Sequence, residues 1–260
     1  MLEDLYQGAK ADFERRRELV SVSALDALIE TVSLPKALSE IFPKRDAIHV
    51  LAEIKRASPS KGRLAEIADP VALAKIYEEA GASAISVLTE ERRFLGSLTD
   101  LNQVSAAVNI ATLRKDFISD EYQILEARAN GASLFLLIVA GLEAKHLRRL
   151  KQFGESLGMT ALVETHSVDE VKIAVDLAST LIGVNARDLS TFETDRGLFE
   201  KVVELIPADA VKVAESAVRN SDDVADYKAQ GADVVLVGEA LVTSDAASML
   251  SSFFGVIHND

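Results

Sequence analysis

Lysines and carboxylates at the ends of short apolar segments are the residues in this sequence best suited to chemistry. Glu53 and Lys55 stand at the end of one such segment, and Lys115, Glu164 and Glu215 stand at the ends of three others. Lysines near several carboxylates suit proton transfer, because burial and neighbouring charges can move the pKa of both groups toward neutrality. These residue types therefore predict general acid–base catalysis.

The spacing of these residues predicts that they converge. Glu53 and Lys55 are two residues apart, as are Asn185 and Arg187, and side chains two residues apart in a strand face the same side. An ion-pair layer or a solvated rim is the alternative for any one of these charges. Polar groups at the ends of six predicted strands favour a shared site. Hydroxyls, glycines and predicted helix starts after the last two strands suit a phosphate.

The segments that must position these residues alternate between strand and helix patterns. Short continuous apolar runs predict strands at residues 49–54, 84–88, 111–113, 134–139, 160–163, 181–184, 211–214 and 234–237. Helical patterns lie between them, at residues 70–80, 121–129, 143–157, 168–177 and 222–229. Buried strands separated by helices indicate a parallel sheet, and eight such units predict an α/β protein with a closed (β/α)8 barrel. Active sites of these barrels lie at the C-terminal ends of the strands.

The 260 residues are expected to form one domain, since (β/α)8 barrels commonly contain about 250 residues. Residues 1–45 precede the first predicted strand and are predicted to be an N-terminal helical extension, with helices at 2–17 and 23–39 that end near Pro43. The extension is expected to cap one end of the barrel, and it could also cover part of the active-site face.

Composition excludes several classes of protein. The chain contains no cysteine, which excludes disulfides, thiolate nucleophiles and cysteine-bound metals and fits a cytoplasmic location. Its formal net charge of −13 argues against binding to nucleic acid. No apolar run reaches the roughly 18 residues of a membrane span, so no membrane association is expected.

Neither a metal nor a cofactor is expected. The four histidines, at positions 49, 146, 166 and 258, lack ligand spacing and are interpreted as surface or packing residues. No Walker-type or G-x-G-x-x-G loop is present, which argues against a nucleotide cofactor. Ser58 and Lys61 form a Ser-x-x-Lys pattern, but this pattern follows a predicted strand and has no partner motif, so an acyl-transfer site is set aside.

Residues 52–62 (AEIKRASPSKG) resemble the signature segment of indole-3-glycerol-phosphate synthases. Similar family blocks follow in order: LRKDF at 113–117, LVETH at 162–166, GVNARDL at 183–189, AES at 214–216 and VGEAL at 237–241. The likeness spans roughly residues 1–255. It implies a TIM barrel and a lyase of tryptophan biosynthesis. The implied reaction is ring closure, decarboxylation and dehydration of 1-(2-carboxyphenylamino)-1-deoxyribulose 5-phosphate.

The resemblance also implies catalytic roles. Lys115 would be the general acid that protonates the ribulose carbonyl, and Glu164 would be the base and proton shuttle of later steps, particularly dehydration. Lys55 would bind the phosphate and could also donate a proton, while Glu53 would set its position and charge. Which lysine donates at which step is left open by the sequence.

Other expected roles concern substrate binding. Asn185 and Glu215 would hold sugar hydroxyls or charge, and Arg187 would pair with the anthranilate carboxylate. Ser58 would contact the substrate from the first loop. An apolar wall against the aromatic ring is expected from Pro59, Phe117 and Leu136. The phosphate is expected to lie against Ser216, Ala217, Gly238 and Glu239.

Two departures from the family pattern stand out. Ala217 occupies a position where the family usually has glycine, and a positive φ there would cost an alanine on the order of 1 kcal/mol. Ala111 and Thr112 replace a common Pro-Val pair, a change that is expected to be structural only.

Three alternatives are considered. A related phosphate-binding barrel, such as phosphoribosylanthranilate isomerase or the tryptophan synthase α subunit, is disfavoured because the chain lacks cysteine and contains the 52–62 segment. A catalytically silent barrel is disfavoured by the presence of Lys115 and Glu164. A protein that works chiefly within a complex is the third. We expect a monomer with a small phosphorylated substrate and possible transient contact with other tryptophan-pathway enzymes.

Overall fold

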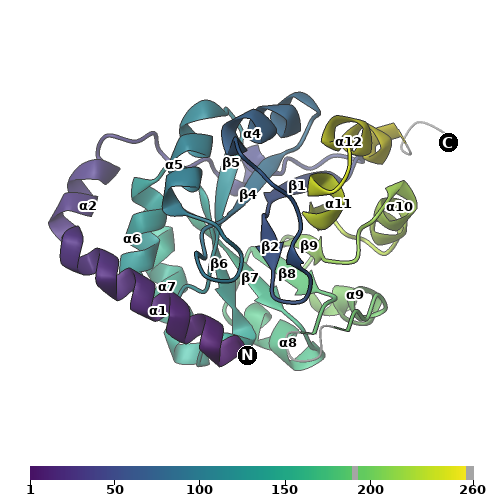
Figure 1. Cartoon of the computed structure of the whole chain (residues 1–260). Helices are drawn as coiled ribbons and strands as arrows, with labels where there is room; N and C mark the ends of the chain where they lie inside the picture. The colour runs from purple at the N-terminus through teal and green to yellow at the C-terminus, as the bar shows by residue number, and fades with distance from the viewer. Residues whose placement is uncertain (189–192, 256–260) are drawn as a thin grey trace.

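Eight parallel strands close into a barrel in the computed structural model, which describes residues 1–188 and 193–255 (Figure 1). Around the barrel the hydrogen-bonded order is β1-β10-β9-β8-β7-β6-β5-β4, and β4 pairs with β1 to complete the ring. The barrel strands are β1 His49–Ile54, β4 Ala84–Leu88, β5 Ala111–Lys115, β6 Leu134–Ile138, β7 Thr160–Thr165, β8 Leu181–Asn185, β9 Val211–Glu215 and β10 Val234–Val237. The predicted (β/α)8 barrel is confirmed.

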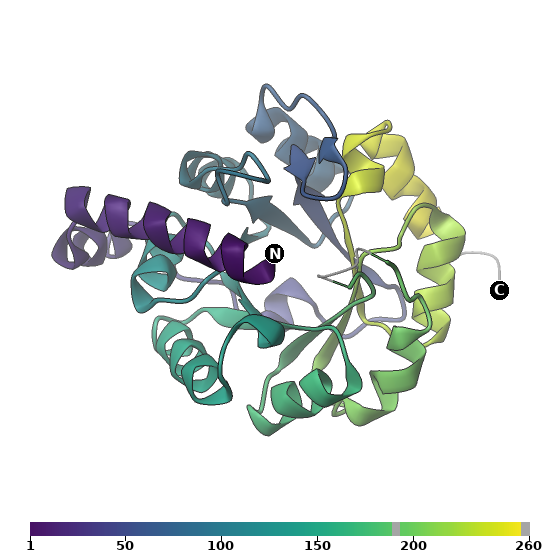
Figure 2. The ribbon, with the colours of Figure 1, turned by 60° about the horizontal axis from the view of Figure 1, so that its bottom comes forward.

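Helices follow the strands and form an outer layer (Figure 2). Side-chain caps explain where several of them begin: Asp69, for example, accepts hydrogen bonds from the backbone N–H groups of Val71 and Ala72. The outer helices are α4 Pro70–Glu79, α5 Leu98–Ala107, α6 Glu121–Ala129, α7 Ala144–Ser156, α8 Val168–Asp176, α9 Leu198–Val202, α10 Ser221–Ala229, α11 Glu239–Val242 and α12 Ala246–Gly255. Short elements complete the fold: the hairpin β2 Ala57–Ser58 and β3 Gly62–Arg63, and the 3-10 turns η1 Val139–Gly141 and η2 Val203–Leu205.

Alternation along each strand separates two cores. In β1, Val50, Ala52 and Ile54 belong to the apolar cluster between the sheet and its helices, whereas Leu51 belongs to the cluster inside the barrel. Because side chains alternate between the two faces, Glu53 points into the barrel with Leu51. This alternation brings the polar residues at the strand ends into one interior.

The N-terminal extension contains α1 Leu2–Leu19, α2 Val22–Ile29 and α3 Leu38–Ile41. The predicted helix at 23–39 is therefore wrong over residues 30–37, which separate α2 from α3. Residues 30–37 are not helical, and the physical reason is Pro35, which lacks a backbone N–H and disfavours helical geometry at Leu34. The predicted first helix is confirmed and extends two residues further.

Helix α1 lies across the barrel mouth, and its amino-terminal end reaches toward the centre of the ring (Figure 2). Arg16 donates to Glu126 of α6 over 2.5 Å, and Arg92 donates to Asp12 over 2.8 Å. The ring of Tyr6 packs edge-on against Phe117, with ring centroids 5.6 Å apart. The extension therefore covers part of the active-site face of the barrel.

Strands β1, β4 and β10 match their predicted bounds, and four others run one or two residues further. Strands β5, β7, β8 and β9 end at Lys115, Thr165, Asn185 and Glu215 respectively. The apolar pattern stops before these residues because they are polar, whereas the backbone ladder continues through them. In contrast, β6 ends at Ile138, since Val139 begins a 3-10 turn.

Among the helices of the described part of the chain, none is long and apolar enough to cross a membrane.

Candidate active site

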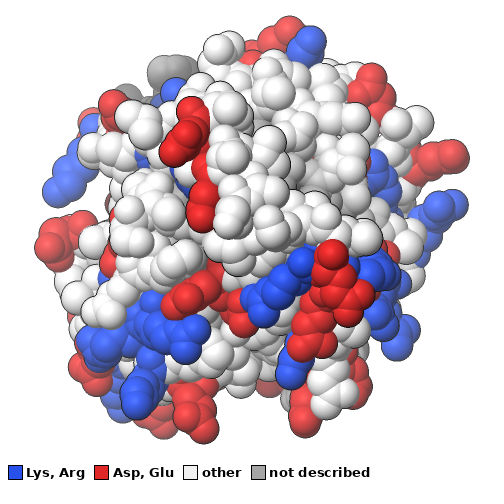
Figure 3. All heavy atoms as spheres, turned by 90° about the vertical axis from the view of Figure 1, so that its left-hand side faces the viewer, with Lys and Arg blue, Asp and Glu red and all other residues white. Residues whose placement is uncertain are grey.

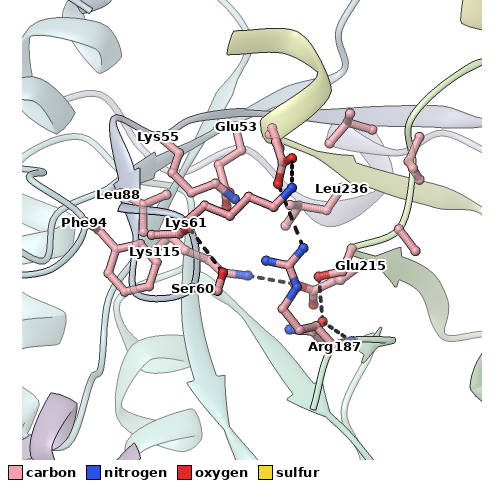
Figure 4. Close-up of a pocket in the computed structure, with 18 of the residues that line it drawn as sticks. Glu53, Lys55, Ser60, Lys61, Leu88, Phe94, Lys115, Arg187, Glu215 and Leu236 are labelled. Atoms are coloured by element: carbon pink, nitrogen blue, oxygen red, sulfur yellow. Dashed lines mark hydrogen bonds and ion pairs between the residues drawn. The ribbon is translucent and has the colours of Figure 1, made fainter. Parts of the chain in front are cut away.

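A pocket of about 800 Å³ opens at the C-terminal ends of the strands. Figure 4 shows Lys55, Lys115 and Arg187 converging there from three segments. The pocket is lined by every residue proposed from the sequence for the site: Glu53, Lys55, Ser58, Pro59, Lys115, Phe117, Leu136, Glu164, Asn185, Arg187, Glu215, Ser216, Ala217, Gly238 and Glu239.

Lys115 lies at the centre of this pocket between two buried carboxylates. Its Nζ is 2.8 Å from Glu164 Oε2 and 2.7 Å from Glu215 Oε2. Burial opposes the charge on Lys115, but the carboxylates of Glu164, Glu215 and Glu53 raise its pKa above the ordinary value. Lys115 is therefore held as an ammonium group that can give a proton to a bound molecule.

The two carboxylates beside Lys115 differ in their affinity for a proton. Burial and the negative charge of Glu164 raise the pKa of Glu215 to about 8. Burial also disfavours ionisation of Glu164, but the charge of Lys115 and the contact with His166 hold the pKa of Glu164 well below its ordinary value. Neighbouring groups whose pKa values are pushed apart can serve as an acid and a base in one site.

A second ion pair supports the centre from β1. Lys55 Nζ lies 2.8 Å from Glu53 Oε1, and the Ser86 hydroxyl donates to Glu53 Oε2 over 3.2 Å. Burial opposes ionisation of Glu53, but Lys55 and Lys115 lower its pKa. A Cβ at Gly238 would stand 2.6 Å from Glu53 Oε1, so only glycine leaves room for this pair.

Asn185 connects Glu164 with Ser216 and the backbone of Arg187. Its Nδ2 donates to Glu164 Oε1 over 3.1 Å, and its Oδ1 accepts from the Ser216 hydroxyl over 2.7 Å and from the Arg187 backbone N–H over 3.0 Å. Its side chain is therefore held in one orientation, with the amide nitrogen toward the carboxylate.

The backbone after β9 has an unusual conformation. Ser216 and Ala217 have φ values of 65° and 62°, in the left-handed region that favours glycine. Ala217 therefore carries the strain that an alanine has at a positive φ, as expected from its departure from the family's glycine. Ala111 and Thr112 begin β5 at the opposite end from Lys115 and do not line the pocket.

An apolar wall and a charged mouth complete the pocket. Phe94, which the sequence analysis missed, packs beside Phe117 with ring centroids 6.0 Å apart. Lys61 forms an ion pair with Glu239 across the opening, and Arg187 lies 4.0 Å from Glu239. Phe94 follows β4 in a segment without a family block, so sequence offered no signal for it. Residues Met1 and Leu5 also line the pocket.

His166 corrects the interpretation of the histidines. It was assigned to the surface or to packing, but its Nε2 lies 3.2 Å from Glu164 Oε1 and its Nδ1 lies 3.3 Å from Glu170 Oε2. Burial opposes protonation, but these two carboxylates raise the pKa of His166 to about 10. Its spacing of two residues from Glu164 was the available signal. Among the residues proposed from sequence, Leu189 and His258 lie outside the described part of the chain.

Within residues 1–188 and 193–255, no group of three or more His, Asp or Glu side chains is arranged to hold a metal ion.

Fold and site together define a (β/α)8-barrel enzyme with acid–base groups at the C-terminal ends of its strands. Solved structures share this fold at low sequence identity. The 3-hexulose-6-phosphate synthase from Salmonella typhimurium has a TM-score of 0.64 and 14% identity, covering 81% of this chain and 98% of that one. Thiamine phosphate pyrophosphorylase from Pyrococcus furiosus has a TM-score of 0.60 and 13% identity, covering 82% of this chain and 96% of that one.

The sequence comparisons are more specific. The family model for indole-3-glycerol phosphate synthase matches residues 2–252. Proteins of that name from Leifsonia xyli and Beutenbergia cavernae are 56% and 50% identical, covering 98% and 94% of this chain and 98% and 90% of their own lengths. Indole-3-glycerol phosphate synthase 1 from Streptomyces coelicolor is 53% identical, covering 94% of this chain and 90% of its own. The chain belongs to the indole-3-glycerol phosphate synthase family, as its sequence predicted.

Proposed function

We propose that the chain converts 1-(2-carboxyphenylamino)-1-deoxyribulose 5-phosphate into indole-3-glycerol phosphate by acid–base catalysis without a cofactor. The observation that carries the proposal is the position of Lys115 Nζ between Glu164 and Glu215 in a pocket with room for such a substrate. Membership of the family supports the choice of substrate.

Lys115 acts in the first step as the general acid. The aryl carbon that bears the carboxylate attacks the ribulose carbonyl carbon, and the carbonyl oxygen takes a proton from the Lys115 ammonium group. The ring then loses CO2, and the electron pair of the broken carbon–carbon bond restores aromaticity. A positioned acid of this kind contributes about 10²–10⁴-fold to the rate.

Glu164 acts in the dehydration. Its ionised carboxylate takes a proton from the carbon next to the nitrogen, while the hydroxyl formed in the first step leaves as water with a proton from a neighbouring acid. The low pKa of Glu164 keeps it ionised, and the amide of Asn185 holds it in place. Glu215 keeps Lys115 in position and, with its raised pKa, can hold a proton near neutral pH.

The two ends of the pocket orient the substrate. The phosphate lies against Lys55 and the backbone N–H groups around Ser216, Ala217, Gly238 and Glu239, while Arg187 pairs with the substrate carboxylate. Pro59, Phe117 and Leu136 contact the aromatic ring, and Ser58 contacts the substrate from the first loop. Anchoring both ends presses the aryl carbon against the carbonyl, which converts binding energy into orientation.

We also propose that the enzyme is a cytoplasmic monomer that makes only transient contact with other enzymes of the pathway. Acidic and basic side chains lie next to one another along the lower part and the rim of the face in Figure 3. The N-terminal extension forms ion pairs of this kind, such as Arg15–Glu91 and Arg17–Asp120. A mixed-sign surface disfavours strong association through charge. Sedimentation equilibrium tests this, and a stable dimer at micromolar concentration would contradict it.

The test of the function is a turnover assay with the carboxyphenylamino-deoxyribulose phosphate in the presence of a chelator, followed by indole fluorescence. Rapid growth of the signal is expected. Tight substrate binding without turnover would favour a silent barrel, and absence of binding would show that the substrate is wrong. Loss of the signal on adding chelator would contradict a metal-free reaction.

A further inference from the structure

His166 stands behind the proposed base, between two separate pockets. Glu164 lines the large pocket, whereas His166 and Glu170 line a second pocket of about 400 Å³ under the amino-terminal end of α1. The side chains of Glu164, His166 and Glu170 are 3%, 7% and 20% exposed. The three residues therefore form a graded series from the buried centre toward solvent on the side away from the substrate.

The imidazole ring meets a carboxylate at each nitrogen, with hydrogen-bond geometry at Nδ1 and at ion-pair distance without hydrogen-bond geometry at Nε2. Nε2 lies 3.2 Å from Glu164 Oε1, and Nδ1 lies 3.3 Å from Glu170 Oε2. Glu170 Oε2 also accepts the backbone N–H of His166 over 2.8 Å, because α8 begins directly after β7. The other acidic groups around the second pocket are Glu3 of α1 and Asp188 after β8. Met1, which carries the amino-terminal ammonium group, also lines this pocket. The carboxylates of Glu164 and Glu170 contact the ring directly and favour the imidazolium form.

The proposed reaction consumes one proton in each turnover. The substrate carries a carboxylate and a phosphate, whereas the products are a phosphate ester, neutral CO2 and neutral water. The dehydration takes one proton and returns one, so the proton that Lys115 gives to the carbonyl oxygen is the one that must be replaced. A substrate that fills the large pocket stands between Lys115 and solvent on that side.

We propose that His166, held by Glu170, is the positioning and proton-transfer residue through which solvent protons reach Glu164 and then Lys115. This inference rests on the proposed function. The imidazolium turns slightly and gives its Nε2 proton to Glu164 Oε1, which lies 3.2 Å away. The neutral carboxyl group of Glu164 then rotates, and the same proton passes to the neutral amine of Lys115, which lies 2.8 Å from Oε2 in the ionised state. The neutral ring then regains a proton from solvent in the second pocket. No oxidant or further reactant is needed, because the net change is one proton moved from solvent to the lysine.

The experiment compares His166→Gln with the wild type over pH 6.5–9.5. We expect kcat to fall about 10–100-fold, with KM changed less than twofold. This loss is smaller than the roughly 10²–10⁴-fold contribution of a group that exchanges a proton with the substrate itself, because His166 acts through Glu164. The loss should grow as pH rises, because fewer protons are available without the relay. Added imidazole should restore part of kcat in His166→Ala and reach saturation.

Two further variants separate proton transfer from structure. Glu170→Gln keeps an oxygen that accepts the His166 backbone N–H but removes the charge, so the alkaline limb of its kcat profile should move to lower pH. Asp169→Asn is the matched control, since Asp169 is adjacent to Glu170 in sequence, is 87% exposed and pairs with Lys172 over 2.8 Å. Its profile should equal that of the wild type.

The outcomes distinguish the relay from the function. An inactive wild type would overturn the proposed function itself. An active wild type with a pH-independent loss in His166→Gln and no rescue by imidazole would overturn the relay and leave the function standing. If His166→Gln does not fold, an unchanged profile in Glu170→Gln would overturn it as well.

Discussion

The centre of the pocket and its phosphate end are built by different means. At the centre, the buried ammonium group of Lys115 lies 2.8 Å from Glu164 and 2.7 Å from Glu215 and stabilises the negative charge on these carboxylates. At the phosphate end, the backbone at Ser216 and Ala217 takes positive φ values, and Gly238 leaves space that a Cβ would fill. The centre of the pocket depends on side-chain charge, whereas its phosphate end depends on backbone conformation.

This difference indicates how each region responds to change. Removal of one partner from a buried ion pair leaves an uncompensated charge and is strongly unfavourable. Removal or addition of a methyl group at a strained backbone position changes stability by only about 1 kcal/mol. The centre should therefore be intolerant of substitution, whereas the backbone at Ser216 and Ala217 in the phosphate end should be tolerant.

The largest effect is expected from Lys115→Ala. It removes the proposed acid and leaves Glu164 and Glu215 facing each other, so kcat should fall by about 10²–10⁴-fold while the substrate still binds. Steady-state kinetics and a binding titration measure the two effects. Lys172→Ala, on the exposed side of α8, is the control. Near-normal turnover in Lys115→Ala would remove this lysine as the general acid.

A second test of the centre uses Gly183→Ala. A Cβ at Gly183 would stand 2.0 Å from Glu215 Oε1, so the carboxylate must move away from Lys115. We expect a loss of about 1–3 kcal/mol of stability, typical of overpacking, together with a lower kcat. Gly197→Ala, whose Cβ would first meet the exposed Asp195 side chain at 3.3 Å, is the control. Equal activity in both variants would show that Glu215 need not be fixed.

The pH dependence of stability tests the charge distribution at the centre. Because the pKa of Glu215 is raised to about 8 in the folded state, the folded protein keeps a proton that the unfolded chain loses above pH about 4.5. The stability that the protonated Glu215 contributes is therefore present at low pH and is lost as pH rises toward 8. Glu215→Gln should remove that slope, which thermal melts at pH 5.5–9 would show as a shift of a few degrees. Parallel Tm profiles would contradict the raised pKa.

The smallest effect is expected at the phosphate end. Ala217→Gly relieves the positive φ of 62° but gives the unfolded chain more freedom, so the net gain in stability should be below about 1 kcal/mol. Denaturant unfolding measures it, and KM for the phosphorylated substrate should fall or stay equal. A destabilisation above 1 kcal/mol would show that the left-handed backbone is not strained by the alanine.

Much of the architecture could be predicted because its signals are local. The apolar runs predicted all eight barrel strands, since a parallel strand is buried on both faces. The helix at 23–39 was wrong because the periodic pattern continued through Pro35, where the backbone cannot follow it. Phe94 and the amino-terminal end of α1 were missed as pocket residues because no sequence pattern connects them with the strand ends.

The sequence by itself determined the order of the elements, the family and the residues that gather at the strand ends, because parallel strands in a barrel deliver these ends to one side. Only the tertiary structure decided that Lys115 contacts both Glu164 and Glu215, that His166 connects Glu164 with a second pocket, and that Ala217 has a positive φ. Distances between side chains, burial and backbone angles arise from contacts between distant segments. The pKa values follow from those distances, so a linear pattern could not determine them.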